Sequence, residues 1–326
     1  MHSEYVRFVR KAVFTSVGHQ FQRIISQKKD SLSRDKTVKT FVRLNARKII
    51  AAATIGGSTL AVLINLYINF TQYDIISPDK FIPLTINKIT PVNHNTSIFR
   101  LKYPKPLKEN LPITSCFHIK DDSIQIVREY TPISPTDEKN YIEFLIKRYN
   151  DGYLSRYIHS LKEGNIVEVR GPILTFPYTP NMKAYIGMIC GGTGITPMYQ
   201  LINHILCNPD DKTKLYMIYA NVTKQDILLL RELDQLSQEH PDRLKIFYTL
   251  DQPPNDELWT QGVGYVSHNA IKNFIPGPQE DVLILVCGPE GMIRYVSGDK
   301  ARDLSQGPVG GVLKNLGYKQ HQVFKF

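Results

Sequence analysis

Short apolar runs separated by turn residues fill residues 81–176. Alternation of apolar and polar residues is typical of half-buried strands, and the close spacing of the runs favours an antiparallel barrel or sandwich. One helix-like stretch, at 153–161, interrupts them. The pattern predicts strands over 81–90, 96–104, 115–120, 124–132, 141–149 and 165–172.

The pattern of apolar and polar residues changes at residue 184. From there the apolar runs are almost continuous, and helix-like segments separate them. The runs are at 184–190, 214–220, 243–250 and 282–287. Strands that are buried on both faces have this pattern, which predicts a parallel sheet with helices between its strands. We therefore expect an all-β barrel domain at 81–180, followed by an α/β nucleotide-binding domain at 181–326.

Residues 49–70 contain no charged side chain. As a helix, 22 residues would span roughly 33 Å, which is enough to cross a bilayer. The alternative is a buried helix of a soluble core, but the flanking Arg47 and Lys48 argue against it. The sequence thus predicts one transmembrane helix at 49–70, preceded by a basic leader at 1–48 and joined to the barrel by a linker at 71–80.

The net charge of +10 comes almost entirely from the leader, which has 12 Lys or Arg against three acidic residues. The other 278 residues hold 28 basic and 27 acidic side chains, so a nucleic-acid-binding domain is not expected. A basic, acid-poor leader is typical of a mitochondrial transit segment, although basic disordered tails look similar. We favour a mitochondrial membrane, with the endoplasmic reticulum as the alternative. The side of the membrane that the domains face stays open.

The four cysteines form no CxxC pair, and no histidine spacing indicates a metal site. Neither a disulfide scaffold nor a bound metal is therefore expected.

Residues 128–134, REYTPIS, end one of the predicted barrel strands. Strand alternation places Arg128 and Tyr130 on one face and Glu129 on the other, with the hydroxyl of Thr131 following. A cation beside an aromatic ring suits a ligand that combines a phosphate with a flat ring system. The alternative is an ordinary strand end with a solvent-exposed arginine.

The α/β domain opens with a strand that runs into Gly191, Gly192 and Gly194, and a helix begins near Thr196 and Pro197. Glycines let the backbone approach a phosphate, and a helix N-terminus favours an anion. The third glycine of the GxGxxG fingerprint is missing, so an ordinary dinucleotide motif is not indicated. A glycine-rich turn without a ligand is the alternative.

Asp226 follows the second strand of this domain. A carboxylate there can accept hydrogen bonds from an adenosine ribose and repel a 2′-phosphate, which would favour NADH over NADPH. The alternative is a helix cap. The nearby Lys224 and Arg231 weaken the discrimination.

Cys287 ends the fourth strand, and Gly288 and Pro289 then turn the chain away. A thiol at the carboxyl end of a parallel sheet can pack against a nicotinamide ring. A nucleophilic role is disfavoured because no histidine lies nearby in the motif. A buried structural cysteine is the alternative.

Taken in order, the motifs REYTPIS, FLIKRY, GYLS, GGTGITPM and CGPEGM resemble those of the NADH–cytochrome b5 reductase family, within the ferredoxin–NADP reductase superfamily. The resemblance covers about residues 82–326. Within the family, the chain resembles a fungal mitochondrial or membrane-bound branch. This resemblance implies an FAD-containing, NADH-dependent reductase that passes hydride to the flavin and then single electrons to a haem-type acceptor protein such as cytochrome b5. The catalytic unit is expected to be a monomer.

The resemblance also implies roles for individual residues. Arg128 would pair with the FAD pyrophosphate, while Thr196 would approach the flavin from the second domain and Cys287 would face the nicotinamide. Other FAD contacts would come from Tyr130, Thr131, Ile146, Lys147, Tyr149, Gly152, Leu154 and Ser155. NADH would lie across Gly192, Asp226, Cys287, Gly288 and Pro289.

Several residues depart from the family pattern. Tyr153 replaces a lysine and Glu129 replaces a common proline, while Cys116 occupies the place of a family histidine. The lost lysine keeps a second hypothesis open, in which a reductase-like domain without turnover serves as a membrane-held binding or assembly factor. An NADPH-driven reductase of a non-haem acceptor is a further alternative.

Overall fold

The computed structural model describes residues 76–121, 126–255, 258–303 and 305–326, all within one contact unit that spans Asp74–Phe326. The predicted leader at 1–48, the predicted transmembrane helix at 49–70 and half of the linker at 71–80 lie outside these ranges. Among the described helices, none combines the length and the apolar character needed to cross a bilayer.

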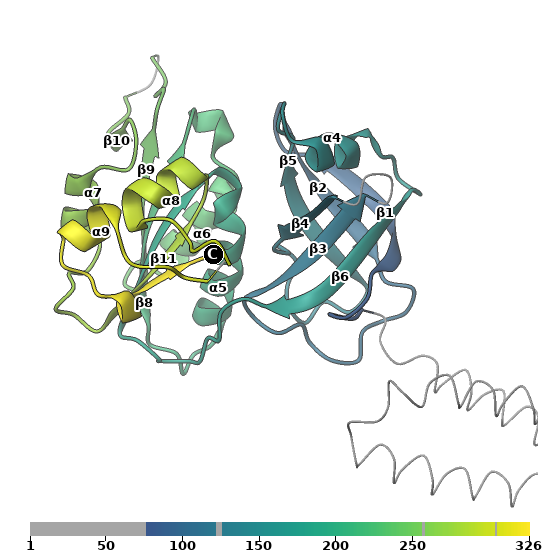
Figure 1. Ribbon diagram of the computed structural model, residues 1–326, viewed down its shortest axis with the longest axis horizontal. Coiled ribbons are helices and arrows are strands. Elements are labelled where there is room, and N and C mark those ends of the chain that lie inside the picture. The colour runs from purple at the N-terminus through teal and green to yellow at the C-terminus, as the bar shows by residue number, and fades with distance from the viewer. Residues whose placement is uncertain (1–75, 122–125, 256–257, 304) are drawn as a thin grey trace, which may run out of the picture. The chain divides into compact units, whose positions relative to one another are not determined.

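Six antiparallel strands form the first sheet, in the order β4-β3-β6-β1-β2-β5 (Figure 1). They are β1 (Ile82–Pro91), β2 (Thr96–Lys102), β3 (Ser115–Asp121), β4 (Ile126–Tyr130), β5 (Tyr141–Lys147) and β6 (Ile166–Leu174). The two edge strands meet where Pro132 bridges Phe144 and the Ile133 amide donates to the Glu143 carbonyl. The sheet therefore closes on itself, and all six predicted strands and the predicted barrel are confirmed.

The inner face of the barrel is apolar and buried. Phe117 and Phe144 have no exposed surface and pack edge to face, with Tyr130 against Phe144. Helix α4 (Tyr153–Ser160) packs on this core through Leu154 and Ile158. The helix that the sequence predicts at 153–161 is thus part of the barrel domain.

The second sheet is parallel throughout, in the order β10-β9-β8-β7-β11-β12. Its strands are β7 (Tyr185–Gly191), β8 (Lys214–Asn221), β9 (Leu244–Leu250), β10 (Gly262–Val263), β11 (Val282–Cys287) and β12 (Val323–Lys325). The helical segments are η1 (Gly192–Gly194), α5 (Ile195–Cys207), η2 (Lys224–Asp226), α6 (Leu230–Glu239), α7 (His268–Phe274), α8 (Glu290–Ser297), α9 (Gly311–Asn315) and η3 (Gln320–Gln322).

Helices cover both faces of this sheet, which explains the continuous apolar strands. Met188 on β7 packs in a cluster with residues of α5 and α6, whereas its neighbour Ile189 packs in a cluster with residues of α7, α8 and α9. Figure 1 shows the two sets of helices on opposite faces. The predicted α/β domain is confirmed.

The C-terminal strand β12 is hydrogen-bonded to the segment at 299–308. Lys325 is fully buried, and its Nζ donates to the carbonyls of Asp299 at 2.9 Å and Pro308 at 3.1 Å. The backbone of Lys325 also exchanges two hydrogen bonds with the Gln306 side chain. The glycine-bearing stretch before β12 is therefore fixed against the last strand of the sheet.

Candidate functional site

Two glycine-bearing turns meet at the carboxyl edge of the parallel sheet. Strands β7 and β11 are neighbours, and Cys190 pairs with Cys287 at their ends. A Cβ on Gly194 would collide with the backbone carbonyl of Cys287, and a Cβ on Gly288 would come within 3.1 Å of the Gly191 nitrogen. The turns after the two strands can touch only because these positions lack side chains.

The first turn leads directly into the N-terminus of α5. Gly192 has a φ of +54°, in the left-handed region that favours glycine, and its carbonyl accepts a hydrogen bond from the Tyr219 hydroxyl at 3.0 Å. Thr196, in the first turn of the helix, is buried, and its hydroxyl donates to the Thr193 carbonyl. The Ile195 amide donates to the Gly192 carbonyl, because η1 runs directly into α5. No side chain caps α5 and no acidic residue lies in its first turn, so the positive end of the helix dipole favours an anion here.

The second turn places Cys287 at the same edge, with Pro289 as the N-cap of α8. Burial raises the pKa of the Cys287 thiol to about 12; the charge of Lys300 acts against this rise and that of Glu129 adds to it. The thiol is therefore protonated at neutral pH, which agrees with the expectation that it is not an activated nucleophile.

Strand β4 carries the arginine and the tyrosine of the REYTPIS motif. Arg128 stands opposite Ile119 and Tyr130 opposite Phe117, while Glu129 pairs with His118. Arg128 and Tyr130 thus share one face, as the alternation predicts. Arg128 is exposed and donates to the Val127 carbonyl, whereas burial raises the pKa of Tyr130 to about 12. Thr131, which follows, is partly buried.

The end of β5 and the start of α4 form a tight corner. The Tyr149 amide donates to the Ser155 hydroxyl, which in turn donates to the Gly152 carbonyl. A Cβ on Gly152 would lie 2.6 Å from the Ser155 hydroxyl oxygen, so the corner needs a glycine. The side chains of Ile146 and Leu154 lie in the barrel core.

Two of the predicted cofactor residues, at and just after the end of β5, contact the α/β domain. Lys147 Nζ lies 3.1 Å from Asp226 Oδ1, and the hydroxyls of Tyr149 and Thr193 are 3.2 Å apart. The other carboxylate oxygen of Asp226 accepts hydrogen bonds from Thr223, in a capping box around η2. Asp226 is therefore a cap of its own turn and, at the same time, one half of an ion pair.

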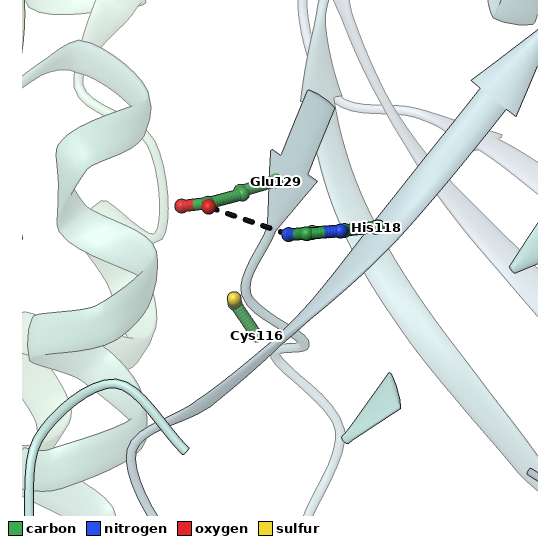
Figure 2. A group of neighbouring side chains, drawn as sticks. All are labelled: Cys116, His118 and Glu129. Atoms are coloured by element: carbon green, nitrogen blue, oxygen red, sulfur yellow. Dashed lines mark hydrogen bonds and ion pairs between the residues drawn. The ribbon is translucent and has the colours of Figure 1, made fainter. Parts of the chain in front are cut away.

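A cluster that sequence reasoning missed lies where β3 faces β4. Figure 2 shows Cys116 and His118 on β3 with Glu129 on β4, and their ligand-type atoms lie within 4.8 Å of one another. His118 Nε2 is 3.3 Å from Glu129 Oε1. Arg170 Nη2 is 2.6 Å from His118 Nδ1, so Nδ1 accepts and Nε2 carries the proton. A metal ion at Nε2 would have to break this arrangement, so we interpret the cluster as an internal hydrogen-bond network.

The residues present fit a flavin dinucleotide and a pyridine dinucleotide. On the barrel, an exposed arginine stands beside a partly buried tyrosine, and Gly152 is the N-cap of α4, which has no side-chain cap and no acidic residue in its first turn. On the α/β domain, the glycine turn and the N-terminus of α5 form a second anion-accepting edge. When bound, FAD supplies the redox chemistry, and these residues would bind and orient it.

Comparison with known proteins supports this interpretation. Residues 83–178 match the oxidoreductase FAD-binding domain and residues 188–298 match the oxidoreductase NAD-binding domain. An NADH-cytochrome b5 reductase-like protein of Arabidopsis thaliana is 45% identical over 77% of this chain and 78% of its own length. The chain belongs to the NADH–cytochrome b5 reductase family.

Other relatives of this reductase family agree. NADH-cytochrome b5 reductase 2 of Aspergillus terreus is 41% identical over 76% of this chain and 78% of its own length. Among solved structures, the cytochrome b5 reductase domain of Ulva prolifera nitrate reductase superimposes with a TM-score of 0.67 at 28% identity, covering 77% of this chain and 99% of that domain. The resemblance noted in the sequence is confirmed, and the chain is an FAD- and NAD-binding oxidoreductase.

Cysteine reactivity tests the protonated state of the thiol at the sheet edge. Cys207 is exposed, whereas Cys116 and Cys190 are buried and Cys287 is only partly exposed. With a pKa of about 12, only about one Cys287 in ten thousand is a thiolate at pH 8. At pH 8 we expect iodoacetamide to label Cys207 first and Cys287 much later. The rate at which Cys287 is labelled should increase as the pH rises, and peptide mass spectrometry measures both rates. Labelling of Cys287 as fast as Cys207 at pH 8 would contradict this assignment.

Proposed function

We propose that this reductase takes hydride from NADH onto bound FAD and passes single electrons to a haem protein of the cytochrome b5 type. The observation that carries the proposal is the contact between the two glycine-bearing turns. It brings the N-terminus of α5 and the Cys287 thiol to one edge of the sheet, in a chain of this family. The names of the relatives motivate the choice of acceptor.

We further propose that residues 49–70 anchor the protein in a membrane, with a mitochondrial membrane favoured over the endoplasmic reticulum. The support is the uncharged 22-residue stretch and the basic leader before it.

One departure from the family pattern bears on how tightly this reductase would hold FAD. Tyr153 stands where the family has a lysine, and it is exposed at the start of α4, close to Asp121. The α4 end of the predicted flavin site therefore has one positive charge fewer. Arg128 would then be the main cation for the FAD pyrophosphate.

Replacement of Arg128 tests the flavin site. Arg128→Ala should lose most of its FAD, because the pyrophosphate would lack its fixed cation, whereas Arg128→Lys should keep part of it. The flavin-to-protein absorbance ratio of the purified protein measures this. Lys88→Ala removes an exposed charge elsewhere on the barrel and serves as the control. An unchanged flavin content in Arg128→Ala would remove Arg128 from the site.

An anaerobic titration tests the reaction. One equivalent of NADH should bleach the flavin absorbance, and soluble cytochrome b5 added afterwards should be reduced at about two haems per NADH, because a hydride carries two electrons. A protein that stays colourless in excess FAD would support the binding-factor alternative. Flavin reduction without transfer to cytochrome b5 would point to another acceptor.

Fractionation of cells tests the anchor. The full chain should stay in the membrane pellet after alkaline carbonate extraction, because an apolar helix is not released by high pH. A chain that begins at residue 71 should be recovered in the supernatant. Release of the full chain by carbonate would refute the anchor, and its absence from the mitochondrial fraction would refute the favoured location.

A further inference from the structure

The carboxylate of Asp226 is engaged on both oxygens, and its side chain is only 8% exposed. Oδ2 accepts hydrogen bonds from the Thr223 amide at 3.2 Å and the Thr223 hydroxyl at 2.8 Å. Oδ1 lies 3.1 Å from Lys147 Nζ. Burial acts to raise the pKa of Asp226, but the bonds from Thr223 and Lys147 outweigh it, so the pKa lies below its ordinary value. Asp226 is therefore ionised, with its charge held in a largely buried pair.

The cation of this pair comes from the barrel rather than from the loop that carries Asp226. Lys147 is the last residue of β5, and its side chain is only 17% exposed. The turn between β1 and β2 lies against the same loop, where the Asn93 amide group donates to the Gln225 carbonyl and His94 Nε2 is 4.0 Å from Asp226 Oδ1. The two domains thus meet at the residue predicted to read the adenosine ribose.

This pairing changes the electrostatic argument for coenzyme preference. An isolated carboxylate repels the 2′-phosphate of NADPH, whereas a carboxylate bound to an ammonium group presents almost no net charge. Both side chains are shielded from water, so salt screens the pair less than it would screen surface charges. Asp226 alone would disfavour NADPH strongly, but the Lys147–Asp226 pair disfavours it much less.

We propose that Lys147 is a specificity-determining residue, which sets the NADH-to-NADPH preference by neutralising Asp226 from the other domain. The inference rests on the proposed function, in which the adenosine ribose of the coenzyme lies at Asp226. Loss of Lys147 leaves the carboxylate uncompensated and strengthens rejection of a 2′-phosphate. Loss of the Asp226 charge leaves an ammonium group that attracts it. A lysine that simply bound the coenzyme phosphates would affect both coenzymes alike.

Two small probes isolate the effect, because 5′-AMP and adenosine 2′,5′-bisphosphate differ only in the 2′-phosphate. Isothermal titration of the FAD-loaded full chain gives the ratio of their dissociation constants. For unit charges about 6 Å apart at an effective dielectric near 40, removing one changes this ratio by about tenfold, and the 2′-phosphate carries between one and two charges at neutral pH. Lys147→Met should therefore disfavour the bisphosphate by about tenfold or more, and Asp226→Asn should favour it by about tenfold or more.

The double variant and the controls separate charge pairing from other effects. Lys147→Met/Asp226→Asn should return within about threefold of the wild-type ratio, because the local net charge is again near zero. Lys147→Arg should keep the wild-type ratio. Lys102→Met removes the same charge from an exposed position at the opposite end of the β2–β5 pairing, where Lys102 stands across from Tyr141, and should change nothing.

The outcomes distinguish this inference from the proposed function. If Lys147→Met leaves the ratio of the two dissociation constants unchanged, whether or not both probes bind more weakly, the inference is wrong and the proposed function stands. Probe binding by Lys147→Arg shows that the site is folded. If the wild-type chain binds neither probe and NADH does not bleach its flavin, the proposed function itself fails. Flavin content and thermal unfolding of each variant show whether it is folded.

Discussion

The candidate site depends on one close contact, in which Gly194 lies against the backbone carbonyl of Cys287. Strands β7 and β11 are paired along their whole length, up to Cys190 and Cys287. The turns that follow the two strands therefore begin side by side and lie in close contact. A side chain at position 194 would push the start of α5 away from β11. Because that position is a glycine, the N-terminus of α5 and the Cys287 thiol share one edge. The positive end of a helix dipole and an uncharged thiol therefore lie within one short stretch of the sheet edge.

The elements could be predicted because burial leaves a local signature. Strands β7, β8, β9 and β11 lie between two layers of helices and are almost continuously apolar, while barrel strands such as β2 alternate. The two-residue β10 and the three-residue β12 are too short to carry a pattern, and neither was predicted. The sequence predicts a turn at the glycines and a helix after it, but the contact of this turn with Cys287 depends on the β7–β11 register, which no local pattern contains.

Contacts that depend on tertiary placement could not be predicted. Sequence reasoning assigned Lys147 to the flavin and weighed Asp226 between a ribose ligand and a cap, without connecting the two residues. They are 79 positions apart and belong to different domains. In the same way, Cys116 and His118 lie two residues apart on one strand, a spacing visible in the sequence. Their proximity to Glu129 and Arg170, however, requires the pairing of β3 with both β4 and β6.

The charges around the two thiols indicate what kind of chemistry this edge supports. Burial raises the pKa of both Cys116 and Cys287 to about 12, and the charge of Glu129 adds to each rise. Arg170 fixes the neutral tautomer of His118, which in turn holds Glu129 by a hydrogen bond. The histidine nearest to Cys116 in the cluster is thus committed to a carboxylate and cannot take the thiol proton as an activating base. The described residues around Cys116 and Cys287 therefore include protonated thiols and the charges of Glu129 and Arg170. Such groups bind and orient a redox cofactor, and they do not attack a substrate.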